Sequence, residues 1–487
     1  MPFRSGPFAL AGIALACLAG LGVRLFMLPH RELTYDEIAT VYFAALPMTE
    51  LWGAAGRLET NPPLFYTLAG IATRLGLSGE WLRVVSILPD IASIALGGWL
   101  ARRLGGAAAG LAAAWLIAGS ASMIEVSLEA RAYSLLAMLG LLGLILTLHV
   151  LRDSRWRGFL ALGLCEVAAL YTHNVAAIML GALNGVALLY WLASQASAPG
   201  LARRWLVTQA LVALAWLFWL PSVLGQATGD LAAFWIAAPD LASLRYAVQR
   251  VVGLGWVTWP QPMADLAFAG LGGLGLLLLA RRPGRERWFA VGLAVFVLAG
   301  VPVATWVISQ WRPLMNGRVL LWLVPIHIVL VAVALGWLRH AGLALAAGLV
   351  VLQLHAIPFW RPTVNAERWP LVADLLREHM RPGDAIYLAP AQGALMLGHY
   401  GWRPEPYQLF GRAEWSWYQR FPGITVANAA AVPALDPGQR IWVVTRHATA
   451  EHDASVARLS SRRSEVRLLR AGGLGRLGLD LSVLLPR

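Results

Sequence analysis

Two adjacent carboxylates, Asp36 and Glu37, lie in the segment Leu33-Thr34-Tyr35-Asp36-Glu37 and are the first residues that could carry chemistry. A carboxylate beside an acceptor hydroxyl can take its proton while a bond forms, which makes both residues candidate general bases. The same pattern also fits an ordinary helix start, in which Thr34 or Asp36 caps a short helix through Leu46. The two interpretations are compatible, because a helix start holds a carboxylate rigidly.

Other ionisable and aromatic residues recur where apolar stretches begin or end. An ionisable residue at the mouth of a membrane helix is by default a functional hypothesis. The alternatives are an interfacial ion pair between Arg131 and Glu129, and a polar turn residue in the case of His173. The residues of this kind are Arg83, Glu125, Glu129, Arg131, Tyr133, His173 and Arg318.

The double proline of Thr60-Asn61-Pro62-Pro63-Leu64-Phe65-Tyr66 marks a second segment close to the two carboxylates. Proline fixes backbone angles, so this segment predicts a stiff entry into another short helix. A structured turn is the plainer interpretation of the same residues.

The composition decides what kind of protein positions these side chains. Of 487 residues, 58% are hydrophobic and 13% are charged, whereas a soluble domain carries roughly 25% charged residues. The apolar residues form runs of about 20, the length that crosses a bilayer as a helix. A soluble multi-domain enzyme is therefore excluded, and a polytopic membrane protein that contacts the lipid bilayer is predicted.

The basic residues indicate membrane topology and not nucleic-acid binding. The net charge is +13 and every basic residue is arginine, but the arginines are dispersed singly or in pairs between apolar runs, as topology signals are. Cys17 and Cys165 lie inside apolar runs, which predicts unpaired thiols. The first run, about 8–29, is longer than the apolar region of a signal peptide and is predicted to be a retained membrane helix.

About eleven membrane helices are expected from the apolar runs. With a cytoplasmic N-terminus every inside connection is short and carries arginine, as the positive-inside rule requires. Asp36, Glu37 and the residues at the helix mouths then all fall at the outer surface. The runs are about 8–29, 83–101, 106–123, 132–150, 158–172, 175–193, 205–222, 263–280, 288–308, 318–338 and 341–358.

Three outside segments are long enough to hold chemistry. The first, about 30–82, is predicted to form amphipathic helices along the membrane surface. The second, about 223–262, is an interfacial loop rich in Trp and Pro. The third is a small α/β unit with strands at Ala385–Ala389 and Arg440–Thr445 and a helix at Glu367–Met380. We therefore predict a transmembrane domain over 1–360 and an extracytoplasmic α/β domain over 361–487.

The order and sidedness of these segments resemble the GT-C glycosyltransferases of family 39, the dolichyl-phosphate-mannose protein mannosyltransferase type, whose bacterial relatives include the aminoarabinose transferase acting on lipid A. The resemblance covers most of the chain. It lies in Tyr35-Asp36-Glu37, Asn61-Pro62-Pro63-Leu64, Arg83, Glu129-Ala130-Arg131-Ala132-Tyr133, Tyr171-Thr172-His173, Arg318 with Pro325, and the stretch from Trp369 to Tyr387.

The resemblance implies transfer of a sugar from a polyprenyl-phosphate carrier to an acceptor hydroxyl on the extracytoplasmic face, which we expect to be the periplasmic face of a bacterial inner membrane. Our hypothesis for the reaction is a single displacement with inversion. Asp36 matches the catalytic base, with Glu37 beside it, and Arg131 matches an arginine of the site. The further substrate contacts that the resemblance implies are Asn61, Arg83, Glu129, Tyr133, His173 and Arg318. Some relatives use lysine on the lipid phosphate, and here only arginine can serve, which is chemically acceptable because a guanidinium grips phosphate with two donors.

Several alternatives stay open at this stage. No cofactor is implied, although Asp36, Glu37, Glu125 and Glu129 could gather a divalent cation. The acceptor could be a glycolipid, a polysaccharide or a protein, and the sugar is not readable from the sequence. A secondary transporter or lipid-linked-sugar flippase would show inverted repeats and charges near the bilayer midplane; we find no convincing repeat, and Glu166 and His327 are the exceptions to the terminal placement of charges. A scaffold whose tail binds a partner is a further alternative.

Overall fold

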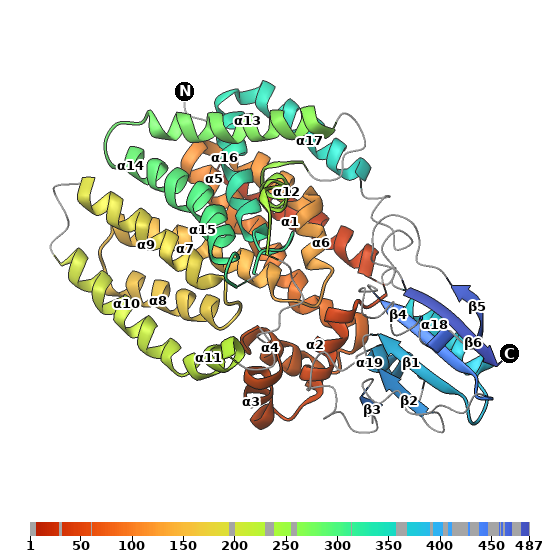
Figure 1. Cartoon of the computed structure of the whole chain (residues 1–487). Helices are drawn as coiled ribbons and strands as arrows, with labels where there is room; N and C mark the ends of the chain where they lie inside the picture. The colour runs from red at the N-terminus through yellow and green to blue at the C-terminus, as the bar shows by residue number, and fades with distance from the viewer. Residues whose placement is uncertain are drawn as a thin grey trace. The chain divides into compact units, whose positions relative to one another are not determined.

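The structure is a computed structural model of the chain, shown in Figure 1. Contacts divide the chain into two compact units, Met1–His30 with Thr40–Arg361 and Arg31–Ala39 with Pro362–Arg487. Each unit is described by itself. The described residues are 6–28, 32–59, 61–193, 200–228, 238–254, 261–312, 314–356, 368–389, 393–402, 408–411, 427–428, 438–446, 457, 459–460, 463–469 and 479–486.

The first unit is entirely helical in its described part. Its helices occupy the apolar runs, with short additional helices in the connections between them. The bounds are α1 (Gly6–Met27), α3 (Met48–Leu58), α4 (Leu64–Arg74), α5 (Val84–Gly119), α6 (Ala121–Ser127), α7 (Tyr133–Arg152), α8 (Trp156–Leu170), α9 (Ala176–Ala193), α10 (Leu201–Leu217), α11 (Leu220–Thr228), α12 (Leu241–Val252), α13 (Gln261–Ala280), α14 (Arg285–Gly292), a π-helical stretch (Leu293–Gly300), α15 (Val301–Ile308), α16 (Val324–Trp337) and α17 (Arg339–Ala356), with 3₁₀ turns at Gly79–Arg83 and Leu321–Leu323. The helix α2 (Tyr35–Ala45) starts in the second unit and ends in the first.

Within the described residues, six helices are long and apolar enough to cross a membrane. The number of eleven crossings is therefore not confirmed, because several apolar runs form helices shorter than a full span, such as α8 with 15 residues. The runs 83–101 and 106–123 are the two legs of α5, joined at Gly106, where φ is +86°. A positive φ suits glycine, and beyond it Gly110 returns against Gly98.

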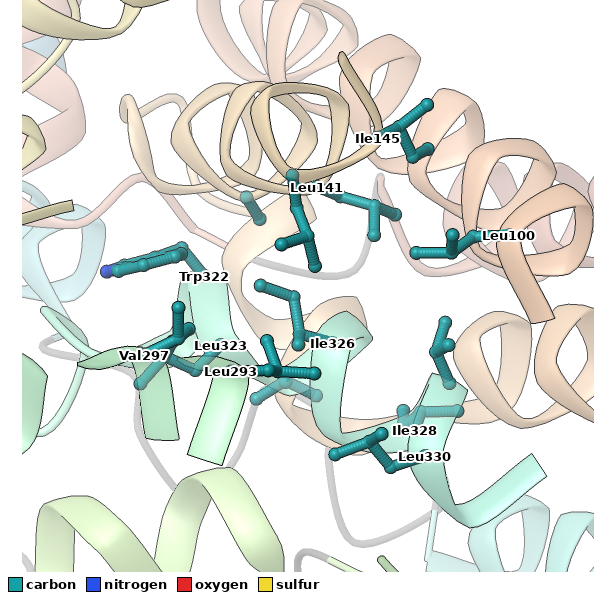
Figure 2. Close-up of a cluster of buried hydrophobic side chains, with 14 of the residues drawn as sticks. Leu100, Leu141, Ile145, Leu293, Val297, Trp322, Leu323, Ile326, Ile328 and Leu330 are labelled. Atoms are coloured by element: carbon teal, nitrogen blue, oxygen red, sulfur yellow. The ribbon is translucent and has the colours of Figure 1, made fainter. Parts of the chain in front are cut away.

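The core of the first unit centres on α16, which is buried along almost its whole length. A helix that is apolar on every side is typical of the inside of a bundle. Figure 2 shows how Trp322 and Ile326 lie opposite Leu141 of α7. Glycines allow the close approaches: a Cβ added at Gly140 would meet the Trp322 ring at 2.7 Å, and one at Gly275 of α13 would meet the Leu330 carbonyl oxygen at 1.9 Å.

The second unit contains a six-stranded sheet with the order β3-β2-β1-β4-β6-β5. The first four strands of that order are parallel, and β6 and β5 pair antiparallel. The observed β1 and α18 lie where the sequence predicts a strand and a helix, and β4 lies one residue later than predicted. The bounds are α18 (Trp369–His379), β1 (Ala385–Ala389), α19 (Gly393–His399), β2 (Gln408–Gly411), β3 (Ala427–Asn428), β4 (Ile441–Arg446), β5 (Arg463–Leu469) and β6 (Leu479–Pro486).

Asp384 fixes the turn that leads into β1. Its carboxylate accepts hydrogen bonds from Arg440 Nε at 2.9 Å and from Trp442 Nε1 at 2.9 Å. Burial alone raises the pKa of Asp384, but the hydrogen bonds and the positive charge of Arg440 outweigh it and leave the pKa below its ordinary value. The charged carboxylate therefore holds the entry of β1 to the start of β4.

Candidate active site

Arg131 is the centre of a buried polar cluster in the first unit. It lies in the turn between α6 and α7 and is 7% exposed. Its Nη1 atom donates to the hydroxyl of Tyr66 at 3.0 Å and lies 3.6 Å from a carboxylate oxygen of Glu59. Its own carbonyl accepts a hydrogen bond of 3.1 Å from Ser86 Oγ on α5. Both the backbone and the guanidinium of Arg131 are therefore fixed.

Tyr66 reaches Arg131 because the double proline starts α4 in the correct place. Pro63 occupies the N-cap position of α4, and the backbone N–H of Leu64 donates to the carbonyl of Tyr171 at 2.9 Å. Burial raises the pKa of Tyr66 well above its ordinary value; Arg131 lowers it and the charge of Glu59 raises it. Tyr66 is therefore a neutral hydroxyl that accepts from the guanidinium.

Asn61 and Glu59 belong to the same cluster and lie in the connection between α3 and α4. Asn61 Nδ2 lies 3.5 Å from Glu59 Oε1, the outer limit for a hydrogen bond. Glu59 is the residue directly after α3 and is 7% exposed. A carboxylate buried to this extent is costly unless it is paired, and Arg131 provides that partner. The predicted contact Asn61 thus lies within the Arg131 cluster.

Two further carboxylate–guanidinium pairs lie near Arg131, at or just before the start of α7. Glu129, almost fully buried, pairs with Arg318 at 3.0 Å, although the two are 189 residues apart. One helical turn earlier, Glu125 pairs with Arg250 of α12. Arg318 is itself placed by Asn316, whose Oδ1 accepts from the Arg318 backbone N–H at 2.8 Å.

His173 and Tyr133 lie beside each other at the mouth of α7. Their ring centroids are 5.7 Å apart, and His173 Nδ1 accepts from the backbone N–H of Val175 at 3.2 Å. Burial and then the positive charge of Arg131 lower the pKa of His173 to about 4. His173 is therefore a neutral imidazole at neutral pH, and it lies within electrostatic range of Arg131.

Arg83 is fully buried and holds the end of another helix. Its Nη1 atom donates to the carbonyl of Leu28, the residue just after α1, at 3.2 Å. The carbonyls at a helix C-terminus lack intrahelical partners, so a guanidinium at this place stabilises the end of α1. The predicted role of Arg83 as a substrate contact stays a prediction.

Asp36 and Glu37 belong to the second unit, at the first turn of α2. Glu37 is fully buried, and its carboxylate accepts a hydrogen bond of 2.9 Å from the backbone N–H of Thr34. This is one half of a capping box, so the helix start predicted here is present. Asp36 is half-buried. The catalytic roles of both residues, and their convergence with Arg131, stay predictions.

Three residues of these clusters were not singled out as site residues by the sequence: Glu59, Tyr66 and Arg250. Tyr66 stands in the double-proline segment, which was a usable signal, because a stiff helix entry also fixes the side chains that follow it. The sequence around Glu59 and Arg250 gives no sign that either residue pairs with an oppositely charged residue elsewhere in the chain. Among the described residues, no group of three or more His, Cys, Asp or Glu side chains is placed to hold a metal ion.

Comparison with known proteins reveals similarity of structure alone. No family model matches the chain, and no curated protein matches its sequence. ArnT of Cupriavidus metallidurans in the apo state is similar with a TM-score of 0.63 and 16% identity over 97% of each chain. The same protein bound to undecaprenyl phosphate gives a TM-score of 0.62 and 16% identity over 99% of this chain and 98% of that one.

The oligosaccharyltransferase of Archaeoglobus fulgidus in the apo form is also similar, with a TM-score of 0.52 and 14% identity over 93% of this chain and 72% of that one. ArnT and the oligosaccharyltransferase are both GT-C glycosyltransferases. The similarity extends over nearly the whole chain, the membrane helices and the C-terminal unit included. The fold expected from the resemblance is thereby confirmed: the chain is a multi-pass membrane protein with the GT-C fold.

Proposed function

We propose that the protein is an integral-membrane glycosyltransferase that moves a sugar from a polyprenyl-phosphate donor to an acceptor hydroxyl. The observation that carries the proposal is the buried Arg131 cluster, set at helix mouths in a chain that shares its fold with ArnT over 97% of its length. ArnT has been solved bound to undecaprenyl phosphate, which supports a donor of this class. The proposed acceptor is a glycolipid, a polysaccharide or a protein.

The proposed reaction is a single displacement with inversion. Asp36 takes the proton of the acceptor hydroxyl while its oxygen attacks the anomeric carbon. The bond between that carbon and the phosphate oxygen breaks, and the polyprenyl phosphate leaves with the electron pair. Glu37 serves this step indirectly, because its hydrogen bond to Thr34 holds the start of α2 and therefore the backbone of Asp36.

The leaving phosphate gains negative charge, and fixed cations stabilise such charge best when they need no rearrangement. Arg131 is held by Tyr66 and Glu59, and Arg318 is held by Glu129, so both guanidiniums are positioned in advance. Arg318 is the more accessible of the two, with 33% of its side chain exposed. We assign the phosphate contact to Arg318 and the positioning of the donor's sugar to Arg131, Asn61, Tyr133 and His173.

The proposal places this chemistry on the periplasmic face of a bacterial inner membrane, with the N-terminus in the cytoplasm. The arginine-bearing short connections between helices support this orientation. The donor's prenyl chain then lies among the membrane helices, which explains why the Arg131 cluster is built at helix mouths.

The test is a comparison of cell-envelope glycans and lipid-linked sugars by mass spectrometry. Cells that lack the protein are restored with the native chain, with Asp36→Asn, or with Glu50→Gln, which removes an exposed carboxylate of α3. We expect one glycan to lose a fixed sugar mass in the deletion strain. The native chain and Glu50→Gln should restore that mass, and Asp36→Asn should not.

Two outcomes would count against the proposal. If Asp36→Asn restores the glycan as well as the native chain does, Asp36 is not the base. If the deletion causes lipid-linked sugar to accumulate on the cytoplasmic face and no transfer activity is found with the purified protein, the flippase alternative is favoured.

A further inference from the structure

A basic cavity lies in the short connection between α13 and α14. This is one of the arginine-bearing connections that the sequence predicts on the opposite side of the membrane from the Arg131 cluster. The cavity has a volume of about 500 Å³, which is within the range of small-molecule sites. Its lining combines three guanidiniums with apolar side chains: Arg281, Arg282, Arg287, Leu277, Ala280 and Val291.

The cavity must lie at a membrane surface, whichever way the chain is oriented. The candidate spans on its two sides are Pro262–Ala280 and Glu286–Ile308, so only five residues connect them. Two spanning helices joined by so short a connection meet at the interface between lipid headgroups and hydrocarbon. Trp288, which lies beside the Arg287 guanidinium at 5.6 Å, is a residue typical of that interface.

One arginine of the cavity is held in place by the rest of the bundle. Arg282 pairs with Glu286 at 3.1 Å and donates to the carbonyl of Leu104 on α5. Glu286 also pairs with Arg152 at the end of α7, at 2.7 Å. These contacts fix the connection against two other helices, so the cavity wall is built and not a loose turn.

The other two arginines supply charge that no carboxylate among the described residues neutralises. Arg281 and Arg287 are exposed, and within the described part of the chain neither has a carboxylate partner. Leu277 lines the cavity from α13, and its side chain is 45% exposed on the outside of this membrane helix. The cavity therefore presents cations at headgroup level and apolar surface at the level of the acyl chains.

We infer that this cavity binds the phosphate headgroup of an anionic phospholipid, with Arg281 and Arg287 on the phosphate and Leu277 and Val291 along the upper part of an acyl chain. Basic pockets between membrane helices bind such headgroups in general. A free phosphate ion would use the guanidiniums but would gain nothing from the apolar wall. The inference does not depend on the proposed transferase activity.

The test is native mass spectrometry of the full-length protein in detergent, titrated with phosphatidylglycerol or phosphatidylcholine. The variant is Arg281→Gln/Arg287→Gln, and the matched control is Arg155→Gln/Arg157→Gln, which also removes two exposed positive charges. We expect phosphatidylglycerol to bind the native chain and the control alike. It should bind the variant roughly thirtyfold more weakly, because each arginine near an anionic lipid contributes about 1 kcal/mol and 1.4 kcal/mol is tenfold.

Three outcomes would overturn the inference. One is equal binding of phosphatidylglycerol and phosphatidylcholine to the native chain, a comparison that needs no variant. Another is unchanged lipid binding by a variant that is folded by size exclusion and thermal melting. The third is displacement of the lipid by millimolar inorganic phosphate, which would make the site one for free anions.

Discussion

The guanidinium of Arg131 and the hydroxyl of Tyr66 form a buried hydrogen bond of 3.0 Å between residues that lie 65 positions apart. This bond joins α4, in the connection between α1 and α5, to the start of α7. The start of α4 directly after Pro63 places Tyr66, and Ser86 of α5 fixes the backbone of Arg131 from a third element. The Arg131 cluster therefore connects three segments of the chain. The contribution of its individual contacts to stability and to transfer can be measured by substitution.

Tyr66→Phe removes the hydroxyl and keeps the ring, whose centroid lies 5.0 Å from the ring centroid of Phe43. The charged guanidinium of Arg131 then loses this hydrogen bond and keeps Glu59 as its ion-pair partner; a hydrogen bond to a charged group contributes about 1.5–3 kcal/mol. We expect a lower Tm in detergent and a loss of sugar transfer of at least about tenfold, since 1.4 kcal/mol of lost positioning corresponds to that factor. The matched control is Tyr171→Phe, whose hydroxyl donates instead to the carbonyl of Ala215 at 2.8 Å. Equal transfer rates for the two variants would show that Tyr66 does not position Arg131.

Glu59→Gln tests the ion pair of the same cluster. Both side chains of the pair are about nine-tenths buried, and loss of one partner of a buried pair costs about 3–5 kcal/mol. We expect Glu59→Gln and Arg131→Gln each to lower the free energy of unfolding, and the double variant to cost less than the two single losses added together. The measurement is a double-mutant cycle from denaturation in detergent. Strictly additive losses would mean that the two residues do not interact.

Asp36 and Glu37 should separate into a chemical and a structural role. Glu37→Ala loses the hydrogen bond to Thr34, so we expect lower stability by about 1 kcal/mol, the usual size of a lost helix cap. Asp36→Asn should leave Tm unchanged and reduce transfer at least about a hundredfold, the scale of a lost general base. Transfer by the purified protein and its Tm are both measured. The reverse pattern, with Glu37→Ala folded but inactive and Asp36→Asn active, would exchange the two assignments.

The elements of this chain were more predictable than its pairings. The helix start at Asp36 and Glu37, the strand at 385–389 and the reversal between 101 and 106 each follow from local patterns of capping, alternation or apolar periodicity. The partners of Arg131 and Arg318 do not, because Tyr66 and Glu129 lie 65 and 189 residues away from them. Spacing along the chain carries no information on such contacts. The sequence groups the candidate site residues only because all of them are predicted on the same side of the membrane. That prediction does not tell which of them pair with one another.

His173 should reveal its neutral state in the pH dependence of stability. Its folded pKa, about 4, lies below its ordinary value of 6.5, so protonation favours the unfolded chain. We therefore expect its contribution to stability to be complete above about pH 6.5 and to be lost as the pH falls from there toward 4. The check is Tm against pH for the native chain and for His173→Gln, whose slope in this window should be shallower. Identical slopes would mean that His173 titrates normally.

The contact between α13 and α16 allows a test of the fold with two glycines of one helix. A Cβ at Gly275 would lie 1.9 Å from the carbonyl oxygen of Leu330, whereas a Cβ at Gly273 would meet nothing within 4 Å. Gly275→Ala must push the two backbones apart, and overpacking of this kind costs about 1–3 kcal/mol. Gly273→Ala gains helix propensity of up to about 1 kcal/mol without a clash. We expect Tm in detergent to fall for Gly275→Ala and to stay level or rise for Gly273→Ala. If Gly275→Ala has the same Tm as the native chain, α13 and α16 do not approach as closely as the structure places them.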